Sequence, residues 1–228
     1  GGKKYQAGAN CDQYDYKNLK VETGIDTLEQ MTTEFFASQT QDGQCYNFID
    51  FDNDGDLDLY IAKCRQGVTN PADGRRINVM FVNDGNNNFT EDAAAYNINV
   101  GWQTWTASFG DIDNDGDLDL LVTNHDHASQ IFENDGTGHY TDITNNSGFD
   151  VSDITPVEST MEDFDNDGFV DLLIAGSSNR YFHNNGNKTF TKIEGLFNTN
   201  DMLSFATGDL NHDGLIDLYT SYGDAYNN

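Results

Sequence analysis

The stretch "DFDNDGDLD" (residues 50–58) places five aspartates in nine positions. At about 4 Å and an effective dielectric of about 20, each close pair of like charges costs on the order of 4 kcal/mol. The stretch recurs as "DIDNDGDLD" from Asp111, "DFDNDGFVD" from Asp163 and "DLNHDGLID" from Asp209. Four copies of such a costly loop indicate that the acidic side chains share one purpose.

The sequence around each copy repeats as well. Each loop reads D-x-[DN]-x-D-G-x-x-D and is followed by an apolar run, "LYIA", "LLVT", "LLIA" or "LYTS". The first three copies continue to an Asn-[Asp/Asn]-Gly turn between a short apolar strand and an aromatic-Thr strand. Asn-Gly and Asp-Gly turns are the strongest short-range hairpin signal. One unit therefore contains four short antiparallel strands.

Repeated four-stranded units predict the blades of a β-propeller. The expected fold is all-β, with four-stranded antiparallel blades and one acidic loop, a candidate cation site, in each blade. The predicted blades span residues 45–92, 106–143, 157–193 and 203–228, the last of them incomplete. Runs such as "LDLLVT" carry apolar residues on both faces, which is typical of a sheet covered on both sides.

Alternate acidic side chains on a tight loop can converge on one point, and a glycine at position six permits the turn. An all-oxygen cage suits Ca²⁺, which takes 6–8 oxygens. An EF-hand would need Glu at position twelve, where the chain has Ile61, Val122, Ile174 and Thr220. The alternative is a set of metal-free aspartate turns.

Positions one, three, five and nine would supply side-chain oxygens, and position seven its backbone carbonyl. The predicted ligands are Asp50, Asp52, Asp54, Asp56 and Asp58; Asp111, Asp113, Asp115, Asp117 and Asp119; Asp163, Asp165, Asp167, Phe169 and Asp171; and Asp209, Asn211, Asp213, Leu215 and Asp217. About four Ca²⁺ ions are expected, one per loop. Weaker binding is expected in the fourth loop, where Asn211 replaces an acid.

The loops, preceded by "SFGD" (108–111) or "ATGD" (206–209), resemble the FG-GAP/VCBS repeat. That repeat builds the Ca²⁺-binding β-propellers of integrin α-subunits and of many bacterial surface proteins. The Asn-x-Gly segment resembles the bacterial and cartilage-acidic-protein branch. The resemblance covers residues 45–222 and implies the same ligand positions.

Propellers of this family usually close with seven blades, whereas three and a half are predicted here. The ring is therefore expected to be partial, or to be completed by a neighbouring subunit or by residues 1–44. In the last case "YDYKNLKVET" (14–23) would complete the fourth blade. The chain begins Gly1-Gly2-Lys3, which favours a processed or partial chain.

The net charge limits which classes of partner the surface can bind. The 228 residues include 11 Lys and Arg against 39 Asp and Glu, a net charge of -28. Such a surface excludes nucleic acid and anionic membranes as partners bound by charge. No stretch approaches the roughly 20 apolar residues of a membrane span.

The three cysteines are Cys11, Cys45 and Cys64. A hairpin that pairs Asp50 with Asp58 puts Cys45 opposite residue 63, so a shift of one residue would bring Cys45 and Cys64 together. A Cys45–Cys64 disulfide is therefore predicted. A bridge from Cys11 to either one, or three free thiols, are the alternatives.

Three triplets fit the N-glycosylation pattern, beginning at Asn88, Asn145 and Asn187, and they could carry sugar in a secreted protein.

Two aromatic-rich segments suggest other roles. His125 and His127 could ligate a transition metal, but no third ligand is evident, and a polar loop is favoured. Trp102 and Trp105 could stack on a sugar ring, although packing between blades is the favoured interpretation.

No motif for catalysis is found, and the chain is predicted not to be an enzyme. The expected function is that of a secreted or cell-surface, calcium-binding β-propeller for adhesion to, or recognition of, a protein or glycan. The first alternative is a structural subunit of an extracellular filament or surface assembly, with self-assembly. The second is a non-catalytic propeller accessory to a hydrolase.

Overall fold

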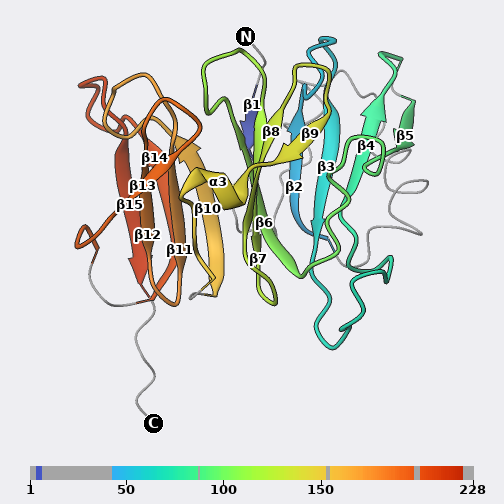
Figure 1. Cartoon of the computed structure of the whole chain (residues 1–228). Coiled ribbons are helices and arrows are strands. Elements are labelled where there is room, and N and C mark those ends of the chain that lie inside the picture. Colours follow the sequence, from blue (N-terminus) through green and yellow to red (C-terminus); the bar gives the residue numbers. More distant parts are fainter. Residues whose placement is uncertain (1–3, 7–42, 87, 153–154, 198–200, 223–228) are drawn as a thin grey trace.

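The computed structural model describes residues 4–6, 43–86, 88–152, 155–197 and 201–222. These residues form four antiparallel sheets that follow one another in chain order, from blue and green to red (Figure 1). The expected all-β fold with four-stranded antiparallel sheets is confirmed. The described sheets do not close into a ring.

The strands have the following bounds. The first sheet holds β2 (Gly43–Ile49), β3 (Asp58–Lys63), β4 (Val79–Asn83) and β5 (Phe89–Glu91), which we count as its first to fourth strands, and β1 (Lys4–Gln6) lies beside β2. The second holds β6 (Thr104–Gly110), β7 (Asp119–Asn124), β8 (Gln130–Asn134) and β9 (Tyr140–Asp142), and is followed by the one-turn helix α3 (Thr144–Ser147). The third holds β10 (Pro156–Glu162), β11 (Asp171–Gly176), β12 (Arg180–Asn184) and β13 (Phe190–Ile193). The fourth holds β14 (Met202–Gly208) and β15 (Asp217–Tyr222).

The second strand of each of the first three sheets is buried along its whole length. These strands read DLYIAK, DLLVTN and DLLIAG, so both faces of each strand carry side chains that avoid water. The expectation that each sheet is covered on both faces is confirmed for these three strands. In β15 the corresponding side chains are exposed or half-buried.

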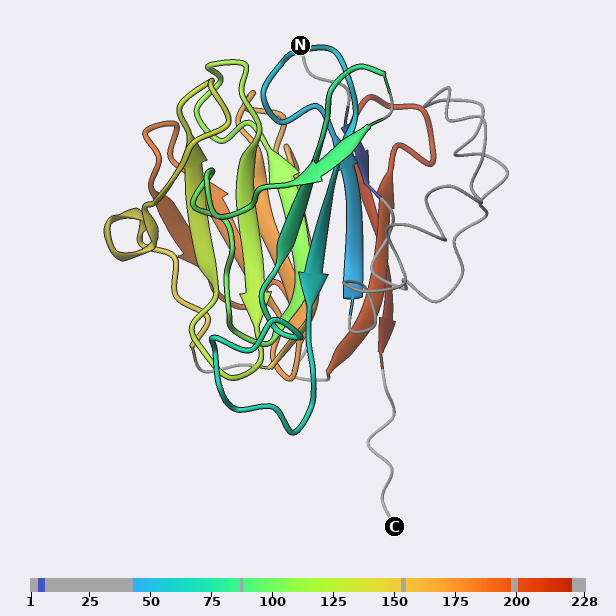
Figure 2. The ribbon, with the colours of Figure 1, turned by 90° about the vertical axis from the view of Figure 1, so that its right-hand side faces the viewer.

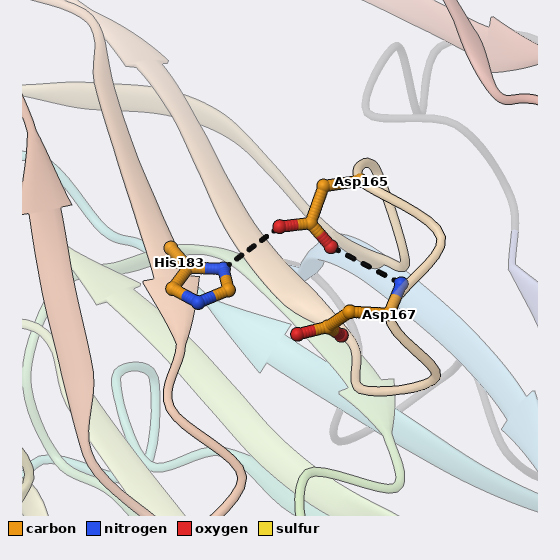
Figure 3. A group of neighbouring side chains, drawn as sticks. All are labelled: Asp165, Asp167 and His183. Atoms are coloured by element: carbon orange, nitrogen blue, oxygen red, sulfur yellow. Dashed lines mark hydrogen bonds and ion pairs between the residues drawn. The ribbon is translucent and has the colours of Figure 1, made fainter.

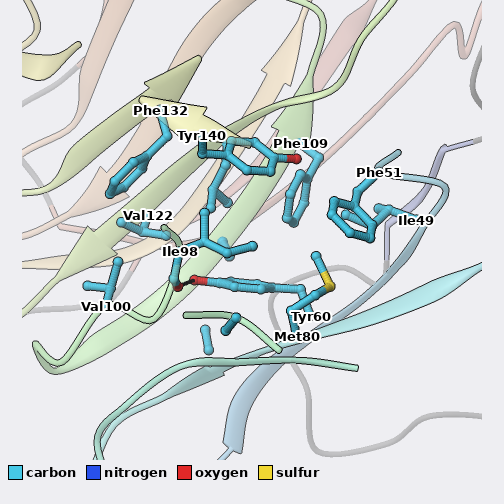
Figure 4. Close-up of a cluster of buried hydrophobic side chains, with 14 of the residues drawn as sticks. Ile49, Phe51, Tyr60, Met80, Ile98, Val100, Phe109, Val122, Phe132 and Tyr140 are labelled. Carbon is cyan, nitrogen blue, oxygen red and sulfur yellow. Dashed lines mark hydrogen bonds between the residues drawn. The ribbon is translucent and has the colours of Figure 1, made fainter. Parts of the chain in front are cut away.

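The cores lie between neighbouring sheets. Figure 4 shows Tyr60 and Met80 of the first sheet packed against Phe109, Phe132 and Tyr140 of the second. A second cluster joins the second sheet to the third, and includes Leu121, Ile131, Met161, Leu172 and Phe182. Each fully buried side chain of this kind contributes about 1.5–3 kcal/mol. The sheets are therefore held face to face by apolar packing.

The first strands of the sheets contact one another in the order β2, β6, β10 and β14. In the side view the strands run along a common axis, so that equivalent loops gather at the same end (Figure 2). This arrangement brings the four acidic loops together at one end of the molecule.

The N-terminal strand β1 extends the first sheet, with Lys4 opposite Ile49 on β2. The predicted strand at residues 14–23, which would complete the fourth blade, lies outside the described residues. The domain boundaries stay a prediction.

The structure corrects the strand register on which the predicted Cys45–Cys64 disulfide depended. Asp58 pairs with Ile49 rather than with Asp50, so Cys45 lies opposite Ala62. The sulfur atoms are not joined to each other. Cys45 Sγ lies 3.7 Å from the carbonyl oxygen of Ala107, and Cys64 Sγ lies 3.4 Å from Oε1 of Gln103. Cys45 thus contacts β6 and Cys64 the residue that precedes β6, and a β-bulge between Gly43 and Cys45 shifts the register beyond Cys45. Cys11 lies outside the described residues.

Candidate metal centres

Four acidic loops connect the first and second strands of the sheets, and we name them loop one (50–58), loop two (111–119), loop three (163–171) and loop four (209–217). Position four of every loop has a positive φ: Asn53, Asn114 and Asn166 at 60° and His212 at 62°. Position six is always a glycine, with φ between 86° and 97°. Asparagine and glycine tolerate this region of backbone space, so local sequence alone accounts for the turn.

The aspartate side chains accept hydrogen bonds from backbone N–H groups of their own loop. In loop three, Asp163 accepts hydrogen bonds from the backbone N–H groups of Asp167 (3.1 Å) and Gly168 (2.9 Å). Asp165 accepts from Asp167 N–H, and Asp167 from Phe169 N–H. Loop four makes the same set of bonds, with Asn211 in the place of the acid. The side chains of positions one, three and five therefore face a common centre.

The carboxylate oxygens of three loops converge closely enough for one cation. The groups Asp50, Asp52 and Asp54, then Asp111, Asp113 and Asp115, and then Asp163, Asp165 and Asp171 each offer oxygens that lie within 4.8 Å of one another. Oxygens bound to one Ca²⁺ at 2.3–2.6 Å lie at most about 5 Å apart. In each loop three of the four predicted side-chain ligands are thus brought together, at positions one, three and five in loops one and two and at positions one, three and nine in loop three. The remaining side-chain ligand of each loop and the carbonyl of position seven stay a prediction.

The aspartate at position nine is the buried member of the set. Asp58, Asp119 and Asp171 are at most 1 % exposed, and each accepts a hydrogen bond of 2.8 Å from the backbone N–H of an asparagine on the third strand. Burial raises the pKa of Asp58 and of Asp119 to about 8, and it also raises the pKa of Asp171. A buried carboxylate is stable as the anion only when a cation compensates it.

Loop one provides the clearest test of whether a cation fits. Within the described part of the chain, Asp52 Oδ1 and Asp58 Oδ2 are buried and have no hydrogen-bond partner. Burial, and then repulsion from Asp54 and Asp50, raises the pKa of Asp52. Buried oxygens without partners carry a desolvation cost that a bound divalent cation removes. The residues of loop one therefore fit Ca²⁺.

Loop two is contacted by a cation of the protein itself. Lys188, on the β12–β13 turn of the third sheet, places Nζ 2.5 Å from Asp113 Oδ2 and also pairs with Oε1 of Glu133. The hydrogen bond to Asp113, followed by that to Glu133, raises the pKa of Lys188. The sequence analysis missed this contact. The ammonium group neutralises part of the acidic cluster and competes for one of its ligands.

A histidine from another strand contacts the carboxylates of loop three. His183 on β12 places Nδ1 3.0 Å from Asp165 Oδ2 (Figure 3). The same nitrogen lies 3.4 Å from Asp171 Oδ1. The sequence analysis did not identify this residue. One signal was available, because His183 immediately precedes the Asn-x-Gly turn, at the position that Val82 and Glu133 occupy in the first two sheets.

Neighbouring loops are linked across the sheets. Asn53 of loop one donates to Asp117 Oδ1 of loop two (2.6 Å), and Asn114 of loop two donates to the carbonyl oxygen of Gly168 in loop three (2.8 Å). The buried Asn134 donates to the carbonyl oxygen of Phe51 (2.8 Å). Loops one, two and three thus form a connected row rather than separate sites.

The aromatic and histidine residues lie at the ends of the sheets opposite the acidic loops. Trp102 stacks on His127, with ring centroids 3.8 Å apart, and Trp105 stacks on His125 at 4.4 Å. The imidazole of His125 contacts the carbonyl oxygen of Pro156, and burial lowers the pKa of His125. Each imidazole ring is therefore engaged by a tryptophan.

The three predicted glycosylation sites are all exposed, on the turns of the first and third sheets (Asn88 and Asn187) and on helix α3 (Asn145). Whether they carry sugar stays a prediction. Among the described residues, no helix has the length and hydropathy of a transmembrane span.

Comparison with known proteins agrees with the repeat pattern. Residues 50–122, 111–174 and 163–220 each match the FG-GAP-like repeat, and together these segments run without a break from residue 50 to residue 220. No curated protein matches the chain.

Proposed function

Because the chain belongs to the FG-GAP-like repeat family, we propose that it forms part of an extracellular, calcium-stabilised β-propeller. The proposed role is adhesion to, or recognition of, a protein or glycan, without catalysis. The observation that carries the proposal is the set of buried oxygens in loop one that lack hydrogen-bond partners. Ca²⁺ would be held by the side chains of positions one, three, five and nine, and would supply the charge compensation that these carboxylates need.

Calcium in this proposal stabilises the fold. With free Ca²⁺ tenfold above Kd, each occupied site adds about 1.4 kcal/mol to the free energy of unfolding. Sites in extracellular modules have Kd values of about 10⁻⁴–10⁻³ M, so millimolar Ca²⁺ is the expected working concentration. Secretion would supply that concentration.

Thermal unfolding in EDTA, in millimolar Ca²⁺ and in millimolar Mg²⁺ tests the metal part of the proposal. We expect a markedly higher melting temperature in Ca²⁺ than in EDTA, and a smaller rise in Mg²⁺, which keeps its waters more tightly. An identical melting temperature in EDTA and Ca²⁺ would show that the loops are metal-free turns.

The end opposite the acidic loops supports the recognition role. Arg76 is fully buried there, donates to the carbonyl oxygen of Val68 (2.8 Å), and lies 2.5 Å from Asp126. Asp126 in turn accepts from the backbone N–H of Gln103, next to the half-buried Trp102. This network orders the loops around a tryptophan, a residue type enriched at binding hot spots.

A glycan array, followed by a screen of matrix proteins, tests recognition. Binding should be lost in Trp102→Ala, while the melting temperature in calcium stays within a few degrees. Binding that survives the substitution would move the recognition site elsewhere on the molecule.

The second candidate function is assembly, which the fourth sheet favours. Among the described residues it has two strands, and it exposes Leu203 (55 %), Leu210 (72 %) and Tyr219 (70 %). Exposed apolar side chains and an open strand edge are typical of surfaces that pair with another chain. Light scattering in millimolar Ca²⁺ distinguishes the candidates, because a polymer supports assembly and a monomer supports recognition.

A further inference from the structure

Loop three differs from loops one and two in the type of atom that reaches it. At the position before the Asn-x-Gly turn, the first sheet carries Val82, the second Glu133 and the third His183. Only the third of these offers a nitrogen. Figure 3 shows the imidazole directed at Asp165, beside Asp167, from a different strand than the loop itself.

The donor atoms of loop three form two overlapping groups. Asp163, Asp165 and Asp171 offer oxygens within 4.8 Å of one another, and Asp165, Asp167 and His183 do the same with a nitrogen included. Asp165 belongs to both groups. Within the described residues His183 Nδ1 is buried and makes no hydrogen bond, although Asp165 Oδ2 lies 3.0 Å away.

The nitrogen decides which ions suit the second group. Ca²⁺ takes oxygen ligands, whereas imidazole suits Zn²⁺ and its neighbours among the first-row transition metals. Bonds of about 2.0–2.2 Å to Zn²⁺ place two donors of a tetrahedron about 3.3–3.6 Å apart. The distance of His183 Nδ1 from Asp165 Oδ2 (3.0 Å) lies close to this spacing, and Asp167 completes a group whose donor atoms lie within 4.8 Å of one another.

We propose that loop three binds a transition-metal ion, represented by Zn²⁺, through His183 Nδ1 and the carboxylates of Asp165 and Asp167. Zinc binding goes beyond the calcium role and does not depend on it. A second part, competition between Zn²⁺ and Ca²⁺ for the shared ligand Asp165, rests on the proposed calcium function.

The surroundings leave the site accessible and hold the neighbouring carboxylate of Asp171 in place. A cavity of about 540 Å³ between the third and fourth sheets is lined by Asp165 and His183 together with apolar side chains, among them Leu173 and Leu218. Tyr181, on the same wall, donates to Asp171 Oδ2 (2.7 Å). An ion can therefore enter from the cavity and keep water on its open positions.

The competing explanation is a plain ion pair between a protonated His183 and Asp165. An ion pair predicts no selective affinity for Zn²⁺. It also predicts that substitution of His183 has no more effect on metal binding than substitution of any other histidine.

Calorimetric titration of the metal-stripped chain with Zn²⁺, under reducing conditions, separates the two explanations. We expect one Zn²⁺ to bind, and we expect both His183→Val and His183→Asn to weaken its affinity at least tenfold. His183→Val introduces the residue type found at the equivalent position of the first sheet, Val82, so β12 should tolerate it. His212→Asn is the matched control, because asparagine occupies that position in the other three loops, and it should leave the Zn²⁺ affinity unchanged.

Co²⁺ as a spectroscopic probe identifies the ligands. Visible bands that disappear in the His183 variants, without the near-ultraviolet bands of cobalt–thiolate bonding, would support the site and exclude the cysteines. Millimolar Ca²⁺ should weaken Zn²⁺ binding several-fold if Asp165 is shared.

The outcomes separate this inference from the calcium function. Unchanged Zn²⁺ affinity in both His183 variants, or no Zn²⁺ binding at all, would overturn the inference even if Ca²⁺ raises the melting temperature. Loss of Zn²⁺ binding in the variants would support it even if Ca²⁺ has no effect on stability. Zn²⁺ binding that is insensitive to Ca²⁺ would refute the competition alone.

Discussion

Replacing Asp58 by asparagine should raise stability without calcium and reduce the stabilisation that calcium adds. Asp58 Oδ1 accepts a hydrogen bond from Asn83 N–H (2.8 Å), and the buried Oδ2 has no partner among the described residues. Asparagine keeps the first bond through its carbonyl oxygen and places a neutral amide at the second position. The substitution therefore removes a buried charge with little change of shape, and it also removes a ligand of the cation.

The expected magnitude without calcium follows from the pKa of Asp58, which burial raises from 3.8 to about 8. A carboxyl whose pKa is higher in the folded state contributes stability that is fully present below pH 3.8 and is lost as the pH rises through about 8. At 1.36 kcal/mol per pH unit, the loss between pH 3.8 and about pH 7 amounts to about 4 kcal/mol. In EDTA the variant should therefore be more stable than the wild type by up to about 4 kcal/mol near pH 7, and equally stable near pH 4.

With calcium the advantage of the variant should shrink. The wild type gains about 1.4 kcal/mol at loop one when free Ca²⁺ is tenfold above Kd, and the gain grows with concentration. The variant loses that gain because its amide nitrogen faces the cation. The stabilisation that Ca²⁺ adds should therefore be smaller in Asp58→Asn by the contribution of one site.

Urea unfolding, followed by tryptophan fluorescence from about pH 4 to pH 8, measures both effects. Each protein is studied in EDTA and in millimolar Ca²⁺. Asp56→Asn is the matched control, because it removes one charge from the same loop and leaves the carbonyl of position seven in place. An Asp58→Asn variant that is less stable than the wild type in EDTA near pH 7, or that keeps the full calcium response, would refute the prediction.

Three further substitutions test the contacts between sheets. Lys188→Met should raise the Ca²⁺ affinity of loop two by about 3- to 10-fold, because it removes an ammonium group 2.5 Å from Asp113; weaker binding by calorimetry would contradict this. Asn134→Ala should lower the free energy of unfolding by about 1–3 kcal/mol, because the carbonyl oxygen of Phe51 loses a buried donor; an unchanged urea midpoint would argue against this link. Gly138→Ala should lower the free energy of unfolding by at least about 1 kcal/mol, because a Cβ there would lie 2.6 Å from the Phe51 ring and the φ of this residue is 79°. A melting temperature equal to that of the wild type would show that Phe51 in loop one moves aside at little cost.

The strands and the acidic loops were predictable because their causes are local. An aspartate that accepts a backbone hydrogen bond two to five residues ahead, as Asp163 does from Asp167 and Gly168, needs only its own loop. A glycine at position six with positive φ is likewise a local requirement. The strand before the loop and the strand after it then place each loop at the end of a sheet.

The cysteine pairing was not predictable because it depends on register. One residue of difference at the loop, Ile49 rather than Asp50 opposite Asp58, moves every later pair along β2 and β3. The bulge at Gly43 and Cys45 moves the register again. The two-residue period of a strand predicts on which face of the sheet a side chain lies. It does not predict which residues of the two strands lie opposite each other across a turn.

By itself, the sequence determined four acidic turns, the strands that flank them and the oxygen-rich chemistry of their centres. Only the tertiary structure decided what else reaches each centre: Lys188 at loop two, His183 at loop three, and in loop one two buried oxygens without hydrogen-bond partners. The physical reason is how far apart in the sequence the interacting residues lie. Turn geometry arises from hydrogen bonds within nine residues, whereas these side chains arrive from other strands and turns, and their positions depend on how the sheets form and pack.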